Sequence, residues 1–290
     1  MARVIPPSEL IINTDGSIFH LHLKPEQLAD RVVLVGDPAR VAMIKTMLDT
    51  IECEVSSREF YTVTGAYKGK RITVLSHGIG GDNIDIVLTE LDALANVDFE
   101  TCQVRENFRQ LTLVRIGTSG SLQEDIPIGS YVAAEKSIGF DGVLYFYAHS
   151  QAVRDLPLEE ELLRQLEWKI EGLKPYAVSA DASLVEQINL NDLHHGCTIA
   201  ANGFYGPQGR FLRMSLADAE LNEKITNFRH EGYRITNYEM ESSVLTGLST
   251  LMGHRSLTVC YIIAGRAVQQ MNTNYKDGLP NLIRKVLDRI

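Results

Sequence analysis

The stretch at residues 111–121 (LTLVRIGTSGS) constrains the fold more than any other part of the chain. It begins with an apolar, β-branched run that is typical of a buried strand, and then breaks at Gly117 and Gly120. Arg115 stands inside this run, where a guanidinium is costly to bury unless an anion or an acid meets it. Exposed glycine amides and neighbouring hydroxyls would complete a cradle for an oxyanion. An arginine paired with a nearby carboxylate would explain the pattern equally well, so both interpretations stay open.

Two earlier apolar runs also end in glycine. Residues 31–35 lead to Gly36, after which Asp37 and Pro38 suit the N-cap and the first position of a helix. This helix would carry Arg40 on its first turn, which indicates either an anion site or a solvated side chain. Residues 72–76 lead to the glycines of 78–81, and residue 82 or 83 would cap a second helix with an apolar face.

Strands and helices alternate along the rest of the chain. Further strands are expected at residues 19–23, 131–137, 176–183, 197–202, 235–238 and 256–264, and further helices at 158–170, at about 242–252 and from about 280. Residues 98–110 are polar and aperiodic, which predicts a surface insertion. Without a repeat or a linker, this order predicts a single α/β domain over residues 19–290, with a mixed central sheet flanked by helices. Residues 1–18 form a lead-in to it.

Composition excludes several classes of protein. A formal net charge of −9 argues against non-specific binding to nucleic acid or to a membrane surface. The four cysteines are scattered without paired spacing, so neither a zinc site nor a disulfide framework is expected. The chain shows no signal-peptide pattern and no apolar run of membrane length, and we therefore expect a cytoplasmic protein.

Six motifs, found in order along the chain, together resemble one family. They are VGDPAR at 35–40, SREF at 57–60, GIGG at 78–81, RIGTSG at 115–120, FYGPQGR at 204–210 and NYEMES at 237–242. The chain is identified by them as similar to nucleoside phosphorylase family I, and most of all to its uridine phosphorylase branch. The resemblance implies the phosphorylase/hydrolase-like fold and a pentosyltransferase that converts uridine and phosphate to uracil and ribose 1-phosphate, in pyrimidine salvage.

The resemblance also implies a role for particular residues. The phosphate would be bound by Gly36, Arg40, Arg115 and Thr118, together with Arg58 from a neighbouring subunit. The ribose would be bound by Glu239, Met240 and Glu241, together with His20 from the partner subunit. The uracil would be bound by Phe204, Gln208 and Arg210. From the residues alone, Glu239 and Glu241 could instead be solvated acids at a helix start, Gln208 and Arg210 an ordinary polar turn, and Phe204 a core residue.

The implied chemistry needs phosphate as co-substrate but no cofactor. Uracil leaves as an anion, so Arg210 near O4 would stabilise the transition state more than the ground state. Purine-specific relatives carry an aspartate after the last strand, where this chain has Ala264-Gly265-Arg266, which favours pyrimidines.

Some relatives bind a monovalent cation between subunits. Glu59 and Ile79 match that site but Asn83 replaces its serine, so no metal is assigned.

The sequence leaves other functions to be distinguished. A nucleosidase of the same fold would use water in place of phosphate, and would leave Arg40, Arg58 and Arg115 without a dianion. A purine nucleoside phosphorylase and a silent binding module are further alternatives. A site shared between subunits implies a homodimer or a hexamer of dimers.

Overall fold

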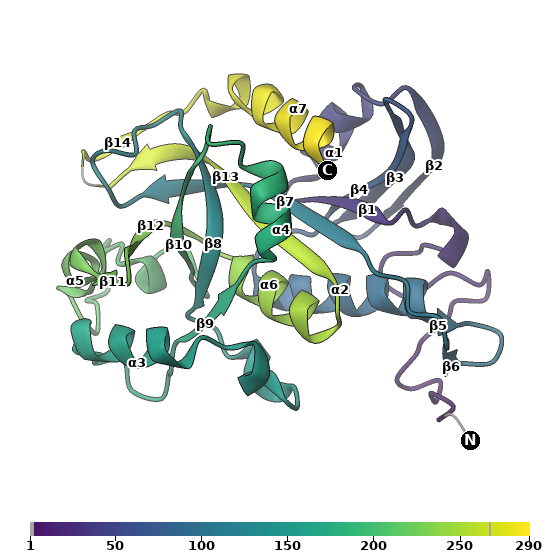
Figure 1. Cartoon of the computed structure of the whole chain (residues 1–290), viewed down its shortest axis with the longest axis horizontal. Helices are drawn as coiled ribbons and strands as arrows, with labels where there is room; N and C mark the ends of the chain where they lie inside the picture. Colours follow the sequence, from purple (N-terminus) through teal and green to yellow (C-terminus); the bar gives the residue numbers. More distant parts are fainter. Residues whose placement is uncertain (1–2, 267) are drawn as a thin grey trace.

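A mixed β-sheet forms the centre of the protein in the computed structural model, which describes residues 3–266 and 268–290 (Figure 1). The strands follow the order β11-β12-β10-β8-β13-β7-β1-β4-β3-β2, with β9 paired to β8 and β14 to β13. Their bounds are β1 Arg31–Val35, β2 Thr50–Ser57, β3 Phe60–Tyr67, β4 Lys70–Ser76, β7 Thr112–Ser121, β8 Tyr131–Gly139, β9 Tyr176–Ser179, β10 His194–Ala200, β11 Arg229–His230, β12 Tyr233–Glu239, β13 Arg255–Gly265 and β14 Gln270–Met271. A separate small hairpin joins β5 (Val97–Asp98) and β6 (Gln103–Val104).

Strand β7 lies at the centre of this arrangement. It is parallel to β1 on one side and to β13 on the other, and β1 is in turn parallel to β4. The sheet then curves so that the end of β12 pairs antiparallel with the end of β7, with Asn237 opposite Ser121 and Tyr238 opposite Gly120. This pairing brings the polar ends of two strands that are distant in sequence side by side.

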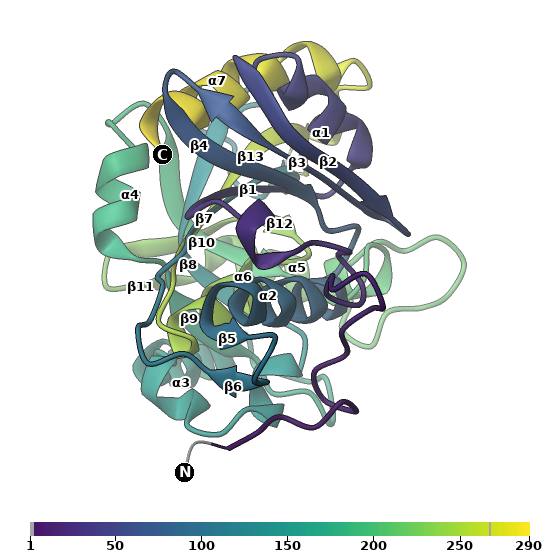
Figure 2. The ribbon, with the colours of Figure 1, turned by 90° about the vertical axis from the view of Figure 1, so that its right-hand side faces the viewer.

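Helices cover both faces of the sheet (Figures 1 and 2). The helices α1 (Pro38–Lys45), α4 (Ala182–Ile188) and α7 (Leu279–Arg289) pack on one face, and α2 (Gly81–Asn96) and α6 (Ser242–Leu251) pack on the other. The side chains of β1 alternate between the two faces of the sheet. Val33 and Val35 belong to the core cluster that includes α1, α4 and α7, and Val32 and Leu34 belong to the cluster that includes α2 and α6. Helices α3 (Leu156–Gln165) and α5 (Leu221–Asn227) contribute to a third cluster against β10 and β12.

The predicted mixed α/β fold is confirmed. The described residues also form five short 3₁₀ helices. They are η1 Pro25–Gln27, η2 Val143–Phe146, η3 Ser150–Val153, η4 Gly206–Gln208 and η5 Tyr275–Asp277. The predicted helix after Asp37 is present as α1, and the Asp37 side chain accepts a hydrogen bond from the Ala39 amide at 2.9 Å. Within the described residues, no helix is both long enough and apolar enough to span a membrane.

Two predicted strands differ from the structure. The break expected at Gly117 is absent, because β7 continues to Ser121 and β13 pairs with it along its whole length. The strand expected at residues 19–23 is a turn, in which the Ile18 amide donates to the Leu23 carbonyl at 2.8 Å and His22 has a φ of 55°. The alternating side chains suggested a strand, but this backbone is held by Glu90 of α2, whose carboxylate accepts from the amides of His20 and Leu21.

Other predicted boundaries were also wrong. Helix α2 is capped by Gly80, with a φ of 99°, and not by residue 82 or 83. The extended segment predicted at 176–183 ends at Ser179, because the Asp181 side chain accepts from the Leu184 amide and begins α4. Helix α3 ends at Gln165, before the predicted end at 170. The expected insertion at 98–110 contains the hairpin strand β6.

Candidate active site

A cleft of about 890 Å³ lies where the ends of β1, β7, β12 and β13 meet. Most of the residues that the sequence assigned to phosphate, ribose and base line it, and the exceptions are His20 and Arg58. The lining residues among those predicted are Gly36, Arg40, Arg115, Thr118, Phe204, Gln208, Arg210, Glu239, Met240 and Glu241. The structure therefore brings these residues of four motifs, which are distant in the sequence, together at one place.

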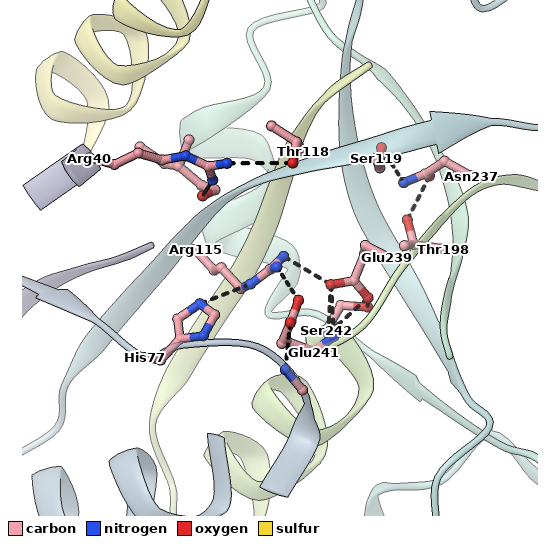
Figure 3. Close-up of polar contacts among 12 residues, drawn as sticks. Arg40, His77, Arg115, Thr118, Ser119, Thr198, Asn237, Glu239, Glu241 and Ser242 are labelled. Atoms are coloured by element: carbon pink, nitrogen blue, oxygen red, sulfur yellow. Dashed lines mark hydrogen bonds and ion pairs between the residues drawn. The ribbon is translucent and has the colours of Figure 1, made fainter. Parts of the chain in front are cut away.

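Arg115 lines this cleft and is held by two carboxylates (Figure 3). The side chain is buried on β7, with Nη1 2.9 Å from Glu239 Oε2 and Nη2 in contact with Glu241 Oε2. Burial lowers the pKa of Arg115, but the charges of Glu241 and Glu239 outweigh it and raise the pKa above its ordinary value. Of the two interpretations left open by the sequence, the pairing with carboxylates is present in the structure. It explains how the guanidinium is tolerated inside a strand.

Gly117 is required by the conformation of that arginine. The guanidinium folds back over the strand, and a Cβ at position 117 would lie 2.6 Å from Arg115 Nη1. The glycine is therefore needed for space beside the side chain two positions earlier, rather than for a turn. A similar argument applies to Gly36, where a Cβ would lie 3.2 Å from the Gly78 carbonyl.

Glu239 holds the beginning of α6. Its carboxylate accepts hydrogen bonds from the amide of Glu241 at 2.9 Å, and from the amide and hydroxyl of Ser242 at 2.9 and 2.6 Å. These contacts satisfy the donors that a helix start leaves open, as one interpretation of the sequence suggested. The acid is nevertheless buried, with 4% of its surface exposed, and is not the solvated residue that this interpretation assumed.

Glu241 occupies the same buried region but has fewer neutral partners. One oxygen accepts from the Gly80 amide at 2.7 Å, and the other meets Arg115. Burial raises the pKa of Glu241 to about 7, with a further increase caused by Glu239, although the charge of Arg115 acts in the opposite direction. This carboxylate can therefore change its charge near neutral pH.

Arg40 enters the cleft from the first turn of α1. Its Nη1 is 3.5 Å from the Ile116 carbonyl, and its Nη2 is 3.5 Å from Thr118 Oγ1, so its contacts are long (Figure 3). Burial, and then the charge of Arg115, lower the pKa of Arg40 below its ordinary value. Two guanidiniums close together repel each other, so an anion bound between them would stabilise both charges.

Another part of the cleft is lined by the amide of Gln208 and the guanidinium of Arg210, and Arg266 contacts Gln208 without lining the cleft itself. Gln208 is 3% exposed, and its Oε1 accepts from Arg210 Nη1 at 2.6 Å and from Arg266 Nη2 at 3.3 Å. Burial, and then the charge of Arg266, lower the pKa of Arg210 to about 10. The Arg210 guanidinium lies 3.7 Å from the centre of the Phe204 ring, which is half exposed. Arg266 was not assigned from the sequence, although the residues before it were used to argue against purines.

His20 and Arg58 lie together outside the cleft of their own chain. The Phe19 and His20 rings are 4.7 Å apart, and the Arg58 guanidinium carbon is 6.0 Å from the centre of the Phe19 ring. His20 Nδ1 contacts Glu90 Oε1 at 2.6 Å. These two residues were expected to serve a neighbouring subunit, and in this chain they form a separate cluster.

The residues considered for a monovalent cation also belong to the cleft. Glu59, Ile79 and Asn83 all line it, and Asn83 Nδ2 donates to the Ile79 carbonyl at 3.4 Å. The described part of the chain contains no group of three or more His, Cys, Asp or Glu residues that could hold a metal ion.

A family model described as the phosphorylase superfamily matches residues 30–286. The chain belongs to this superfamily. It is 29% identical to a uridine phosphorylase of Thermococcus kodakarensis over 258 residues, which cover 88% of this chain and 80% of that protein. A crystal structure of a Trypanosoma brucei nucleoside phosphorylase, described as showing uridine phosphorylase activity, superimposes with a TM-score of 0.86 at 28% identity and covers 97% of this chain and 98% of that one.

A more local similarity connects the chain to purine enzymes. It is 34% identical to a DeoD-type purine nucleoside phosphorylase of Geobacillus stearothermophilus over 119 residues, which cover 41% of this chain and 45% of that protein. The family predicted from the six motifs is confirmed. The Thermococcus kodakarensis and Trypanosoma brucei proteins, which match over most of both chains, are described as a uridine phosphorylase and as showing uridine phosphorylase activity.

Proposed function

We propose that this superfamily member is a uridine phosphorylase, which catalyses the reversible reaction of uridine with phosphate. A phosphate oxygen forms a bond to C1′ of the ribose while the bond from C1′ to N1 of uracil breaks. The bonding electrons leave with the base, and the products are ribose 1-phosphate and uracil. The enzyme contributes by positioning the two substrates and by stabilising the charge that develops on the base.

The observation that carries this proposal is the arrangement around Gln208. Two guanidiniums donate to its Oε1, which fixes the orientation of the amide, and we expect Nε2 to donate to the base. The positive charges of Arg210 and Arg266 share one buried amide oxygen, and burial opposes both charges. Two cations in this position suit a base that departs as an anion through its carbonyl oxygens. Phe204, stacked on Arg210, offers an aromatic face to that base.

The phosphate is assigned to the other end of the cleft. Arg40 and Arg115 approach it from α1 and β7, and Thr118 and Gly36 add a hydroxyl and a backbone amide. The two carboxylates compensate much of the Arg115 charge. We therefore expect Arg40, and Arg58 from a neighbouring subunit, to contribute strongly to phosphate affinity.

The ribose is assigned to the middle of the cleft. Glu241 has an oxygen paired with a single backbone amide and a pKa near neutrality, which suits a carboxylate that accepts from ribose hydroxyls. Met240 lines the cleft beside it. Glu239 is engaged by the start of α6, and its contribution to ribose binding is to hold Glu241 and Arg115 in place.

One assay distinguishes the proposed reaction from its alternatives. Purified protein is incubated with uridine, with and without phosphate, and uracil, free ribose and ribose 1-phosphate are measured. We expect uracil and ribose 1-phosphate in equal amounts, and only when phosphate is present. Free ribose without phosphate would identify a nucleosidase, and inosine cleaved more efficiently than uridine would identify a purine enzyme. Binding without turnover of either nucleoside would identify a silent module.

A further inference from the structure

His77 is a buried residue beside the phosphate end of the cleft that none of the assigned roles uses. It directly follows β4, is 0% exposed, and its Nε2 lies 3.2 Å from Arg115 Nε (Figure 3). Arginine has no acceptor and keeps its protons, so its Nε must be the donor in this contact. The Nε2 of His77 therefore carries the lone pair, and the imidazole proton lies on Nδ1.

The imidazole is neutral in this position. Burial, and then the charges of Arg115 and Arg40, keep the pKa of His77 well below its ordinary value. A protonated ring would place an N–H against an N–H and add a third cation to the group. The geometry and the surrounding charges thus require the same protonation state.

With His77 included, Arg115 is held on both sides of its guanidinium. Glu239 and Glu241 bind the outer nitrogens from the end of β12 and the start of α6, whereas His77 binds the inner nitrogen from the end of β4. Contacts from two directions fix both the position and the rotation of a planar group. If only the two carboxylates held Arg115, any movement of their side chains would also rotate the guanidinium.

The chemical type of the residue at 77 matters for an anion site. A carboxylate there could also accept from Arg115 Nε, but it would be a third acid around one guanidinium and would repel an approaching phosphate. A neutral acceptor orients the arginine without removing its charge. Histidine therefore accepts the hydrogen bond from Arg115 Nε without adding a negative charge near the phosphate, and an acid could not do both.

We propose that His77 is a positioning residue for phosphate, which holds Arg115 in its binding orientation through a neutral acceptor nitrogen. This inference rests on the proposed phosphorolysis, because it concerns the site assigned to phosphate. The residue acts through Arg115, and its effect should be on phosphate far more than on the nucleoside.

Three substitutions test this role: His77→Leu, His77→Gln and His77→Glu. The Leu variant removes the acceptor, and we expect its apparent phosphate KM to rise about tenfold or more, with the uridine KM changed by less than about threefold. The Gln variant restores a neutral acceptor and should lie within about threefold of wild type. The Glu variant keeps an acceptor but adds charge, and should bind phosphate more weakly than the Gln variant.

His254→Leu is the matched control, because His254 is another buried histidine that does not line the cleft. Its Nδ1 accepts from the Leu111 amide at 3.2 Å, so its loss should affect stability while leaving the phosphate KM unchanged. Phosphate binding to each folded variant is also measured by calorimetry, which does not depend on turnover. If the Leu variant does not fold, the Gln and Glu variants decide the matter, and equal phosphate affinities in the two would overturn the proposal.

The results separate this inference from the proposed function. Phosphate-dependent cleavage by wild type together with an unchanged phosphate KM in His77→Leu overturns the role of His77 alone. An equal rise in both KM values in that variant also overturns it, because it indicates a general disturbance of the cleft. Uridine cleavage by wild type without phosphate overturns the proposed function and this inference with it.

Discussion

Arg40 carries a positive charge into the cleft with long hydrogen bonds, at 3.5 Å, to the Ile116 carbonyl and to Thr118 Oγ1, and it has Tyr275 beside it. Its replacement should therefore affect ligand binding more than folding. For Arg40→Gln we expect the phosphate KM to rise roughly 10- to 100-fold, the range of a hydrogen bond to a charged group. The unfolding midpoint should change little. Arg284→Gln, on the exposed side of α7, is the matched control, and an equal effect in both variants would contradict the assignment.

Arg115 is unsuitable for the same test, although the sequence also assigns it to the phosphate. Removing it would leave Glu239 and Glu241 buried together without their cation. Breaking a buried pair in this way costs about 3–5 kcal/mol of stability, so a loss of activity could reflect unfolding. The contribution of Arg115 to phosphate binding is better examined through its neighbours.

Glu241 should impose a pH dependence on nucleoside binding. Its pKa is raised by burial to about 7, so the fraction of ionised carboxylate increases as the pH rises through neutrality. Ionised Glu241 accepts from ribose hydroxyls, and we expect the uridine KM to fall over this pH interval at saturating phosphate. In Glu241→Gln this dependence should disappear, and kcat/KM should fall about 10- to 100-fold. A variant that keeps the wild-type profile would remove Glu241 from the ribose site.

The choice of base should follow from Gln208 and Arg210. Cytosine carries an amino group in place of O4, so it would present a donor to guanidiniums that are themselves only donors. The mismatch should reduce kcat/KM for cytidine by about 10³ or more relative to uridine. Initial rates with both nucleosides at the same phosphate concentration measure this ratio. Cytidine cleaved within about tenfold of uridine would contradict the role given to these residues.

At the scale of elements, β7 shows how a strand supports the site. Gly117→Ala would place a methyl group 2.6 Å from Arg115 Nη1 and force the guanidinium away from its carboxylates. We expect loss of most activity and a lowered unfolding midpoint. Gly142→Ala is the matched control, because its Cβ would meet nothing within 4 Å and its φ of −134° suits alanine. Both are followed by thermal unfolding and uridine turnover, and equal results in the two would contradict the packing argument.

The same strand shows where sequence analysis succeeded and where it could not. Apolar periodicity located β1, β4, β7 and β13, and the cap at Asp37 located α1, because these signals are local. The continuation of β7 past Gly117 depends on its pairing with β13, which is remote in the chain. The turn at residues 19–23 depends on the carboxylate of Glu90 in α2, which no local pattern encodes.

In the site, too, the sequence motifs predicted some residues, and others could be found only from contacts in the structure. Most of the residues that the motifs name lie together in one cleft, because the resemblance carries their positions together. His77 and Arg266 were missed, since each acts through a side chain that the motif already names, Arg115 and Gln208. Glu239 was assigned to the ribose, and only its contacts with Ser242 and Arg115 show that its oxygens serve the protein.

At the scale of the whole molecule, the cluster of Phe19, His20 and Arg58 raises the question of subunit assembly. These residues do not line the cleft of their own chain, yet the family resemblance assigns two of them to substrates. A homo-oligomer in which each subunit lends this cluster to its neighbour would reconcile the two statements. A monomer would then have an incomplete phosphate site.

Mixed assemblies test this arrangement. Arg58→Ala and Glu241→Ala chains are each expected to be nearly inactive, but in a mixed dimer the cleft of the Arg58→Ala chain keeps Glu241 and receives Arg58 from its partner. One site of each mixed pair is then intact, and activity should return after the two proteins are unfolded and refolded together.

The control is Arg40→Ala mixed with Glu241→Ala. Both of these residues line one chain's own cleft, so no intact site can form. Recovery in the first mixture and none in the second indicates a shared site. With subunit exchange verified by native mass spectrometry, equal activity in the two mixtures would show that each chain uses its own Arg58 or none.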